Sequence, residues 1–282
     1  MDTLHFMLTN ECNAYQMPRT VDSPGVCKFC YRQTAKIETT PEILKNIFEK
    51  ISNYQKINKI VLTGGEPLVS PYFEQAINNT NALNVYTNLH TNGILLEPKL
   101  SFLEGKVSCI SLPLDGSNPD TEDYYRGKGF FDLTMSNIRK AQKKGFDIGI
   151  NTFVSERNLQ DVENIAKIVS RIEPKYWLLS QYRKINLNQR IGCDVYRSNR
   201  SKFKQVIKKL SEDYPELKVY SLESEQDSYP ERVWVQADGG VYTDLTINSQ
   251  NIFLGSLLDK NLEEFIKMIK HLKLKEKGGL NG

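Results

Sequence analysis

The chain has 282 residues, of which 39% are hydrophobic and 25% are charged, with 37 basic residues against 34 acidic ones. This composition excludes a fibrous or a disordered class, and the length suffices for one large α/β domain or a domain with a short appendage. The net charge of +3 is too small to indicate a nucleic-acid-binding surface, so we do not expect a nucleic-acid partner.

The N-terminus and the cysteines indicate the compartment. No basic leader precedes the first apolar run, and no apolar run approaches the roughly 18 residues of a membrane span. The five cysteines are an odd number with three of them clustered, which argues against a disulfide framework. We therefore expect a cytoplasmic protein that does not interact with membranes.

Apolar, strand-like runs alternate with amphipathic, helix-like segments through the first 182 residues. We expect strands at 4–9, 59–63, 84–91, 109–114, 147–154 and 176–182. Helices are expected from Pro41, from about Pro71, at 98–103, at 133–144 and after Asn158, which is a suitable capping residue. Six such alternations imply parallel strands joined by right-handed crossovers, either curled into a barrel or laid out as an open doubly wound sheet.

The pattern changes after Tyr182. Residues 183–200 are polar and basic, and a helix at about 203–210 and a strand at 218–222 follow them. Alternating residues on both sides of Asp238-Gly239 predict a β-hairpin over 233–243. A last helix is expected from about Asn261.

Three cysteines lie between the first strand and the first helix, at Cys12, Cys27 and Cys30. The C-x-x-C spacing lets two thiolates converge on one metal or cluster, with a third supplied by Cys12 across a loop. A closed zinc site needs a fourth ligand, whereas Cys109 and Cys193 lie far along the chain. The set therefore fits an iron–sulfur cluster with one open iron better than zinc, while a redox pair or simple packing of Cys27 and Cys30 stays open.

A second motif, Gly64-Gly65-Glu66-Pro67, follows the second strand, and the aromatic Phe29 precedes the last cysteine. Together with the cysteines, these residues resemble the radical S-adenosylmethionine (SAM) superfamily. One departure is the first cysteine spacing, because 14 residues stand where the usual pattern has three. A C-x14-C-x2-C spacing is similar to that of some 7-carboxy-7-deazaguanine synthases, so we expect a lengthened cluster loop and not a lost cluster.

The resemblance implies a fold and two cofactors. The fold is an α/β, partial (β/α)6 TIM-like barrel over 1–182, with the site at the carboxyl ends of the strands, closed by a short α+β extension over 183–282. The cofactors are SAM and one [4Fe-4S] cluster bound by Cys12, Cys27 and Cys30. The implied chemistry is reductive cleavage of SAM to a 5′-deoxyadenosyl radical, which abstracts hydrogen from the substrate. An external one-electron donor such as flavodoxin or ferredoxin is implied as well.

The resemblance also implies cofactor-binding residues. Glu66 would accept hydrogen bonds from the methionyl ammonium, and Arg126 would face the methionyl carboxylate unless it is an exposed loop arginine. Polar residues at the other strand ends would lie near the ribose or point into the barrel, with a purely structural role as the alternative. The full set is Phe29, Gly64, Gly65, Glu66, Pro67, Thr91, Asn92, Ser111, Asp115, Arg126, Asn151 and Gln181. No residue is assigned a catalytic role.

Two further similarities bear on the substrate. Residues 151–229 resemble viperin, and the run from Val233 resembles superfamily tails that bind auxiliary clusters, although Thr243 and Asp244 replace the expected cysteine. No leader-binding domain precedes the first strand, so we expect a small-molecule substrate such as a nucleotide or another anionic metabolite. Basic and amide side chains after the sixth strand suit its phosphate or carboxylate; these are Arg183, Lys184, Asn186, Asn188, Gln189 and Arg190.

Two alternatives stay open. One is a maturase that modifies a ribosomally made peptide. The other, outside enzymes, is a zinc-binding module in which Cys12, Cys27, Cys30 and Cys193 form a closed site.

Overall fold

The structure is a computed structural model, of which we describe residues 2–23, 27–30, 36–182, 196–223, 232–247 and 250–278. The chain divides into two compact units, and each is described by itself. The first unit comprises Met1–Glu11, Thr34–Thr87 and Ser228–Gly282, and the second comprises Cys12–Gln33 and Asn88–Asp227. N-terminal and C-terminal segments thus share a unit, and the boundary expected after Tyr182 stays a prediction. No helix in the described ranges is both long enough and apolar enough to cross a membrane.

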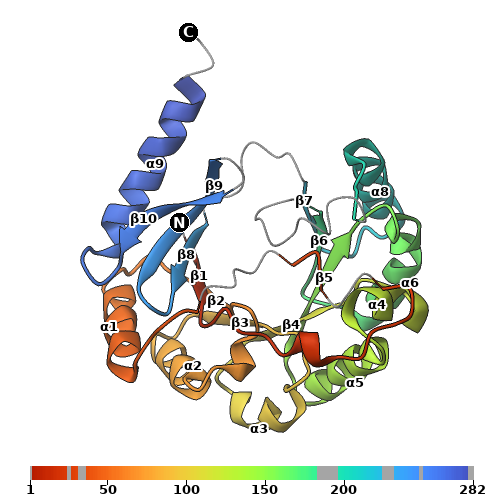
Figure 1. Cartoon of the computed structure of the whole chain (residues 1–282), viewed down its shortest axis with the longest axis horizontal. Coiled ribbons are helices and arrows are strands. Elements are labelled where there is room, and N and C mark those ends of the chain that lie inside the picture. Colours follow the sequence, from red (N-terminus) through yellow and green to blue (C-terminus); the bar gives the residue numbers. More distant parts are fainter. Residues whose placement is uncertain are drawn as a thin grey trace. The chain divides into compact units, whose positions relative to one another are not determined.

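The first unit holds a mixed sheet in the strand order β10-β9-β8-β1-β2 (Figure 1). β1 (Thr3–Met7) pairs in parallel with both β2 (Lys59–Thr63) and β8 (Val233–Gln236). β8 and β9 (Gly240–Ile247) form an antiparallel pair, which confirms the predicted hairpin. β10 (Gln250–Ser256) is a further antiparallel strand, which the sequence analysis did not predict. The helical elements are α1 (Pro41–Ser52), η2 (Pro67–Val69), α2 (Phe73–Ala82) and α9 (Leu262–Gly278).

Helix α1 illustrates how the sequence sets these elements. The Thr40 hydroxyl oxygen accepts a hydrogen bond from the Ile43 amide at 3.2 Å, and Pro41 occupies the first helical position, where no donor is needed. Four apolar side chains at helical spacing are buried, namely Leu44, Ile47, Phe48 and Ile51. The cap fixes where the helix begins, and the apolar stripe fixes which face is buried.

The second unit holds parallel strands in the order β3-β4-β5-β6-β7. They are β3 (Tyr86–His90), whose first two residues belong to the first unit, β4 (Cys109–Pro113), β5 (Asp147–Val154), β6 (Tyr176–Gln181) and β7 (Val219–Leu222). The helical elements are η1 (Ala14–Gln16), η3 (Glu97–Lys99), α3 (Leu100–Leu103), α4 (Pro119–Arg126), α5 (Phe130–Lys143), η4 (Leu159–Asp161), α6 (Val162–Ile172) and α8 (Arg200–Asp213). The expected parallel α/β architecture is confirmed.

The two faces of this second sheet differ in burial. Along β6, half-buried residues alternate strictly with buried ones, and Trp177 and Leu179 are fully buried. Figure 1 shows α5 and α6 on one side of β4, β5 and β6. Paired residues of parallel strands point to the same side, so the register places Asn151 and Leu178 together on the opposite, open face.

Two predictions about single residues are wrong. Gln181 pairs with Val154 and shares the covered face with Leu179, so it does not point to the same side as Asn151. Asn158 does not cap α6, because the 3-10 turn η4 intervenes and α6 begins at Val162. Its buried side-chain amide instead bonds to Ser155, Phe153 and Asp115, and the contact with Asp115 is one that sequence spacing does not reveal.

Candidate active site

The three clustered cysteines are thiols that lie half-buried on one loop of the second unit. The Cys12 Sγ accepts hydrogen bonds from the backbone amide two residues on, at 3.5 Å, and from Asn92 Nδ2, at 3.6 Å. The Cys27 amide donates to the Tyr125 carbonyl at 2.9 Å, and the Cys30 amide donates to the Cys27 carbonyl at 2.9 Å. The C-x-x-C segment is therefore a turn anchored on α4.

The electrostatics at Cys27 suit a bound metal cluster. Burial raises the pKa of the Cys27 thiol to about 12; Arg126 opposes this rise, and Cys30 and Cys12 add to it. A cluster's iron would stabilise the thiolates that burial disfavours, so this donor set fits an iron–sulfur cluster. Among the described residues, no three His, Cys, Asp or Glu side chains converge tightly enough to hold a single ion. Thiolates that each bind a different iron of one cluster do not need that convergence.

Arg126 links the cysteine turn to a buried carboxylate. Its Nε donates to Asp115 Oδ2 at 2.6 Å, and its Nη1 lies 3.9 Å from Cys27 Sγ. The Arg126 side chain is 16% exposed and that of Asp115 is 0% exposed, so the alternative of an exposed loop arginine is wrong. Removing either partner would leave the other charge buried and unbalanced.

The same carboxylate is fixed by backbone contacts and by a second acid. Asp115 Oδ1 accepts from the Phe153 amide at 2.7 Å, and the Asp115 carbonyl accepts from Asn158 Nδ2 at 2.8 Å. Glu122 Oε2 accepts from the Asp115 amide, while Glu122 Oε1 is buried without a hydrogen-bond partner among the described residues. Burial and the Asp115 charge raise the pKa of Glu122 to about 8. Both effects favour the neutral form of Glu122, which leaves Arg126 to balance Asp115.

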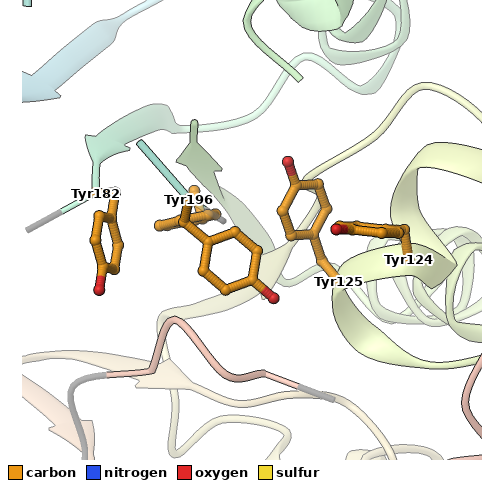
Figure 2. Packing of buried hydrophobic residues seen from close by; sticks show 5 residues of the cluster. Tyr124, Tyr125, Tyr182 and Tyr196 are labelled. Carbon is orange, nitrogen blue, oxygen red and sulfur yellow. The ribbon is translucent and has the colours of Figure 1, made fainter. Parts of the chain in front are cut away.

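Phe29, which precedes Cys30, packs into a cluster of aromatic rings. It stacks on Phe153 with ring centroids 4.0 Å apart and 15° between the planes. Tyr125 and Tyr196 meet it edge-on at 6.0 and 5.7 Å, and the Arg126 guanidinium lies 5.0 Å from its centroid. Figure 2 shows the tyrosines of this cluster in one row: Tyr124, Tyr125, Tyr196 and Tyr182. The rings fix the orientation of Phe29 and thereby of the cysteine turn.

Thr91 and Asn92 follow β3 directly, and their side chains have local partners. Asn92 Nδ2 donates to Asn13 Oδ1 at 2.9 Å, and Asn92 Oδ1 accepts from the Ile94 amide at 2.9 Å. The Thr91 hydroxyl oxygen accepts from the Gly93 amide at 3.0 Å. Asn92 thus ties the end of β3 to the loop that carries Cys12.

The Gly64-Gly65 turn belongs to the first unit, where it touches the backbone after β1. The Gly65 amide donates to the Thr9 carbonyl at 2.6 Å, and the next amide donates to the Glu11 carbonyl at 2.7 Å. A Cβ on Gly64 would lie 2.3 Å from the Thr9 oxygen, and one on Gly65 would lie 2.1 Å from the Glu11 oxygen. Only glycine fits at either position without movement of the backbone.

Glu66 also has a structural role within this turn. It is fully buried, and its Oε1 accepts a hydrogen bond from the Leu68 amide at 3.1 Å. This bond caps η2, which begins at Pro67. A test of Glu66 must therefore preserve the cap.

Within the second unit, the structure gathers part of the predicted set around the cysteines: Phe29, Asn92, Asp115 and Arg126. Ser111 and Asn151 lie on the open face of the sheet instead. The basic segment 183–190 and Cys193 fall outside the described residues.

Sequence reasoning missed helix α4 and its buried acid Glu122. The available signal was Asn118, whose side chain accepts from the Thr121 amide at 3.1 Å, followed by Pro119 at the first helical position.

Comparison with known proteins found a family match, related sequences and similar structures. A family model described as the radical SAM superfamily matches residues 17–169. The AdoMet-dependent heme synthase of Methanosarcina barkeri is 33% identical over 139 residues, which are 48% of this chain and 39% of that protein. The GTP 3',8-cyclase of Microcystis aeruginosa is 30% identical over 182 residues, which are 60% of this chain and 52% of that protein. The chain thus spans about two fifths to one half of these relatives.

A solved structure shows the same fold. The structure of anSMEcpe with bound AdoMet and the Kp18Cys peptide superposes with a TM-score of 0.71 at 17% identity. The match covers 93% of this chain and 79% of that one. The fold is accordingly the partial, unclosed TIM-like barrel of such proteins.

Proposed function

Because this chain belongs to the radical SAM superfamily, we propose that it is an enzyme that cleaves SAM at a cluster held by Cys12, Cys27 and Cys30. A [4Fe-4S] cluster and SAM are the cofactors of this family, and when bound they supply a 5′-deoxyadenosyl radical that abstracts hydrogen from a substrate. The observation that carries the proposal is the anchored cysteine turn, with the guanidinium of Arg126 3.9 Å from Cys27 Sγ.

The chain's own residues would hold and orient these groups. In the proposal, Phe29 and the rings around it hold the cysteine turn in place and exclude water. Arg126, with its Nε held by Asp115, directs its Nη groups to the methionyl carboxylate. Glu66 accepts from the methionyl ammonium, and the two glycines before it let the backbone approach closely.

We propose a small molecule as the substrate. One supporting observation is the cysteine inventory, because beyond Cys30 the sequence has just Cys109 and Cys193, too few for an auxiliary cluster bound by cysteines alone. Cys109 is also fully buried in β4. A related protein, the GTP 3',8-cyclase, acts on a nucleotide by its name. The second candidate is a peptide, which is favoured by the peptide bound to anSMEcpe.

The test is formation of 5′-deoxyadenosine by the reconstituted, chemically reduced protein with SAM. We expect the product from the natural chain and its loss in Glu66→Gln, which keeps an oxygen for the η2 cap but removes the charge. Glu49→Gln, on the exposed surface of α1, is the matched control and should cleave SAM normally. Absence of the product from the natural chain would overturn the proposal.

The substrate class is tested in the same assay. Nucleotides and other small metabolites are compared with peptides encoded near the gene for their ability to stimulate 5′-deoxyadenosine formation. Stimulation by peptides alone would replace the small-molecule hypothesis with the maturase hypothesis.

A further inference from the structure

The open face of the β3–β7 sheet in the second unit carries a connected polar network to which the proposed function above gives no cofactor role, although Ser111 belongs to the set expected to bind the cofactor. Its members come from three strands: Asn88 and His90 from β3, Ser111 from β4 and Tyr176 from β6. The register places them on one face, since His90 pairs with Ser111, Ser111 with Gly149, and Gly149 with Tyr176.

The phenol of Tyr176 is the centre of this network. Its oxygen lies 2.6 Å from Ser111 Oγ and 3.2 Å from His90 Nε2, and it accepts from Asn88 Nδ2 at 3.0 Å. Ser111 Oγ donates to Asn88 Oδ1 at 2.8 Å. With the Ser111 proton used in that way, the phenol donates to Ser111 or to His90. The ring of Tyr176 is therefore held in one orientation by three side chains.

Gly149 makes this arrangement possible. A Cβ at this position would lie 2.5 Å from Ser111 Oγ and 2.6 Å from the Tyr176 ring. The absence of a side chain on β5 lets the phenol cross that strand and reach β4. Glycine in a strand interior is usually unfavourable, and here it marks a close approach.

Asn151 lies two residues further along β5, on the same face. Its Oδ1 is buried and has no hydrogen-bond partner in the described part of the chain. Its neighbours in the register are Pro113 and Leu178, neither of which has a side-chain donor. A buried acceptor without a partner indicates that a donor is supplied from elsewhere.

The charge of this face limits what could supply that donor. The strand residues that form it in the described structure are Asn88, His90, Cys109, Ser111, Pro113, Asp147, Gly149, Asn151, Phe153, Tyr176, Leu178, Ser180, Tyr220 and Leu222. They include no lysine or arginine. Asp147 lies at the amino end of β5, where it pairs with Lys175 at 3.3 Å. A phosphate or carboxylate would find an acceptor oxygen at Asn151 and no cation from these strands; Arg126, which lies over Phe29 where that ring stacks on Phe153, is already paired with Asp115. An anion would therefore bind beside Asn151 unfavourably.

We propose that this face binds an uncharged hydrogen-bonding part of the substrate, a hydroxyl or an amide N–H, through Asn151 and Tyr176. Asn151 accepts the substrate's hydrogen bond, and the fixed phenol of Tyr176, whose strand neighbour Gly149 lies two residues before Asn151, borders the same face. Asn88, His90 and Ser111 are positioning residues, which act by fixing the phenol. Any anionic group of the substrate must then be bound elsewhere. This inference rests on the proposed function, because it assigns part of that enzyme's substrate site.

The experiment compares matched neutral and anionic probes on the reconstituted protein with SAM bound. The pairs are glycerol with glycerol phosphate and N-acetylglycinamide with N-acetylglycine, and binding is followed by ligand-observed saturation-transfer NMR. We expect the neutral member of a pair to bind at least about tenfold more tightly than its anionic partner. Tyr176→Phe and Asn151→Ala should each weaken that binding about tenfold, which is the effect of one hydrogen bond.

Tyr220→Phe is the control. Tyr220 lies on β7, belongs to the same face and is 58% exposed, so removing its hydroxyl should leave binding unchanged. Equal binding of the anionic probes, no binding of either neutral probe, or unchanged binding in both variants would overturn the inference. Formation of 5′-deoxyadenosine, measured on the same preparation, tests the proposed function separately, so the two failures are distinguishable.

Discussion

Replacing Gly65 by alanine should destabilise the protein through a backbone collision. The new Cβ would lie 2.1 Å from the Glu11 carbonyl oxygen and 2.7 Å from the Asn10 carbonyl oxygen, distances that real Cβ atoms do not reach. The turn must move, and it then strains or breaks the bonds from the Gly65 amide to Thr9 and from the Glu66 amide to Glu11, at 2.6 and 2.7 Å. Two lost backbone hydrogen bonds at about 1 kcal/mol each, with partial burial of the unpaired groups, give a loss of about 2–4 kcal/mol.

The assay is equilibrium unfolding in urea of the cluster-free protein, followed by circular dichroism. The matched control is Gly105→Ala, because a Cβ there meets nothing within 4 Å although φ is +71°. That variant should lose about 1–2 kcal/mol, the cost of a left-handed alanine. If Gly65→Ala proved as stable as the natural chain, the claim that this turn needs glycine for steric reasons would be refuted.

Two further predictions concern buried polar groups of the second unit. The pKa of Glu122 rises from 4.5 to about 8 on folding, so the folded state holds its proton more tightly and this group lowers stability as pH rises from about 4.5 to 8. Glu122→Gln should remove that slope and stabilise the protein at high pH by an amount on the order of a few kcal/mol. Urea unfolding across pH tests this, and parallel pH profiles of the variant and the natural chain would contradict it. Asn158→Ala should lower the free energy of unfolding by about 2–4 kcal/mol, because three buried hydrogen bonds are lost. In the natural chain Nδ2 donates to the Asp115 and Phe153 carbonyls at 2.8 and 2.6 Å, and Oδ1 accepts from the Ser155 amide at 2.8 Å. Asn164→Ala, on the exposed side of α6, should stay within about 0.5 kcal/mol, and equal unfolding midpoints for the two variants would contradict this account.

The periodicity of the sequence located nearly all the strands and helices, because their buried faces are apolar. Helix α4 was missed because its buried face is not apolar. Its buried residues are Glu122, Asp123, Tyr124 and Tyr125, so it has no apolar stripe, and its N-terminal cap was the available signal. A pattern of hydrophobic residues does not identify a helix whose buried face is largely acidic and aromatic.

Residues of the candidate site were predictable from the sequence where they belong to one short motif. The cysteines, Phe29 and the glycine turn lie in short sequence patterns, and each has a clear geometric reason in the structure. The face occupied by Gln181 was not predictable, because it depends on the register between β5 and β6. The Tyr176 network and the pairing of Arg126 with Asp115 join residues from separate elements, and one sequence contains no signal for such contacts.

The central claim is that Cys12, Cys27 and Cys30 hold an iron–sulfur cluster. Its most direct test is the iron and sulfide content after anaerobic reconstitution of the natural chain, Cys27→Ala and Cys109→Ala. Cys109 is a fully buried cysteine of β4, so it controls for the loss of any thiol. We predict about four irons and four sulfides per chain in the natural protein and in Cys109→Ala, and loss of both in Cys27→Ala. A single zinc in the natural protein, or a full cluster in Cys27→Ala, would contradict the account.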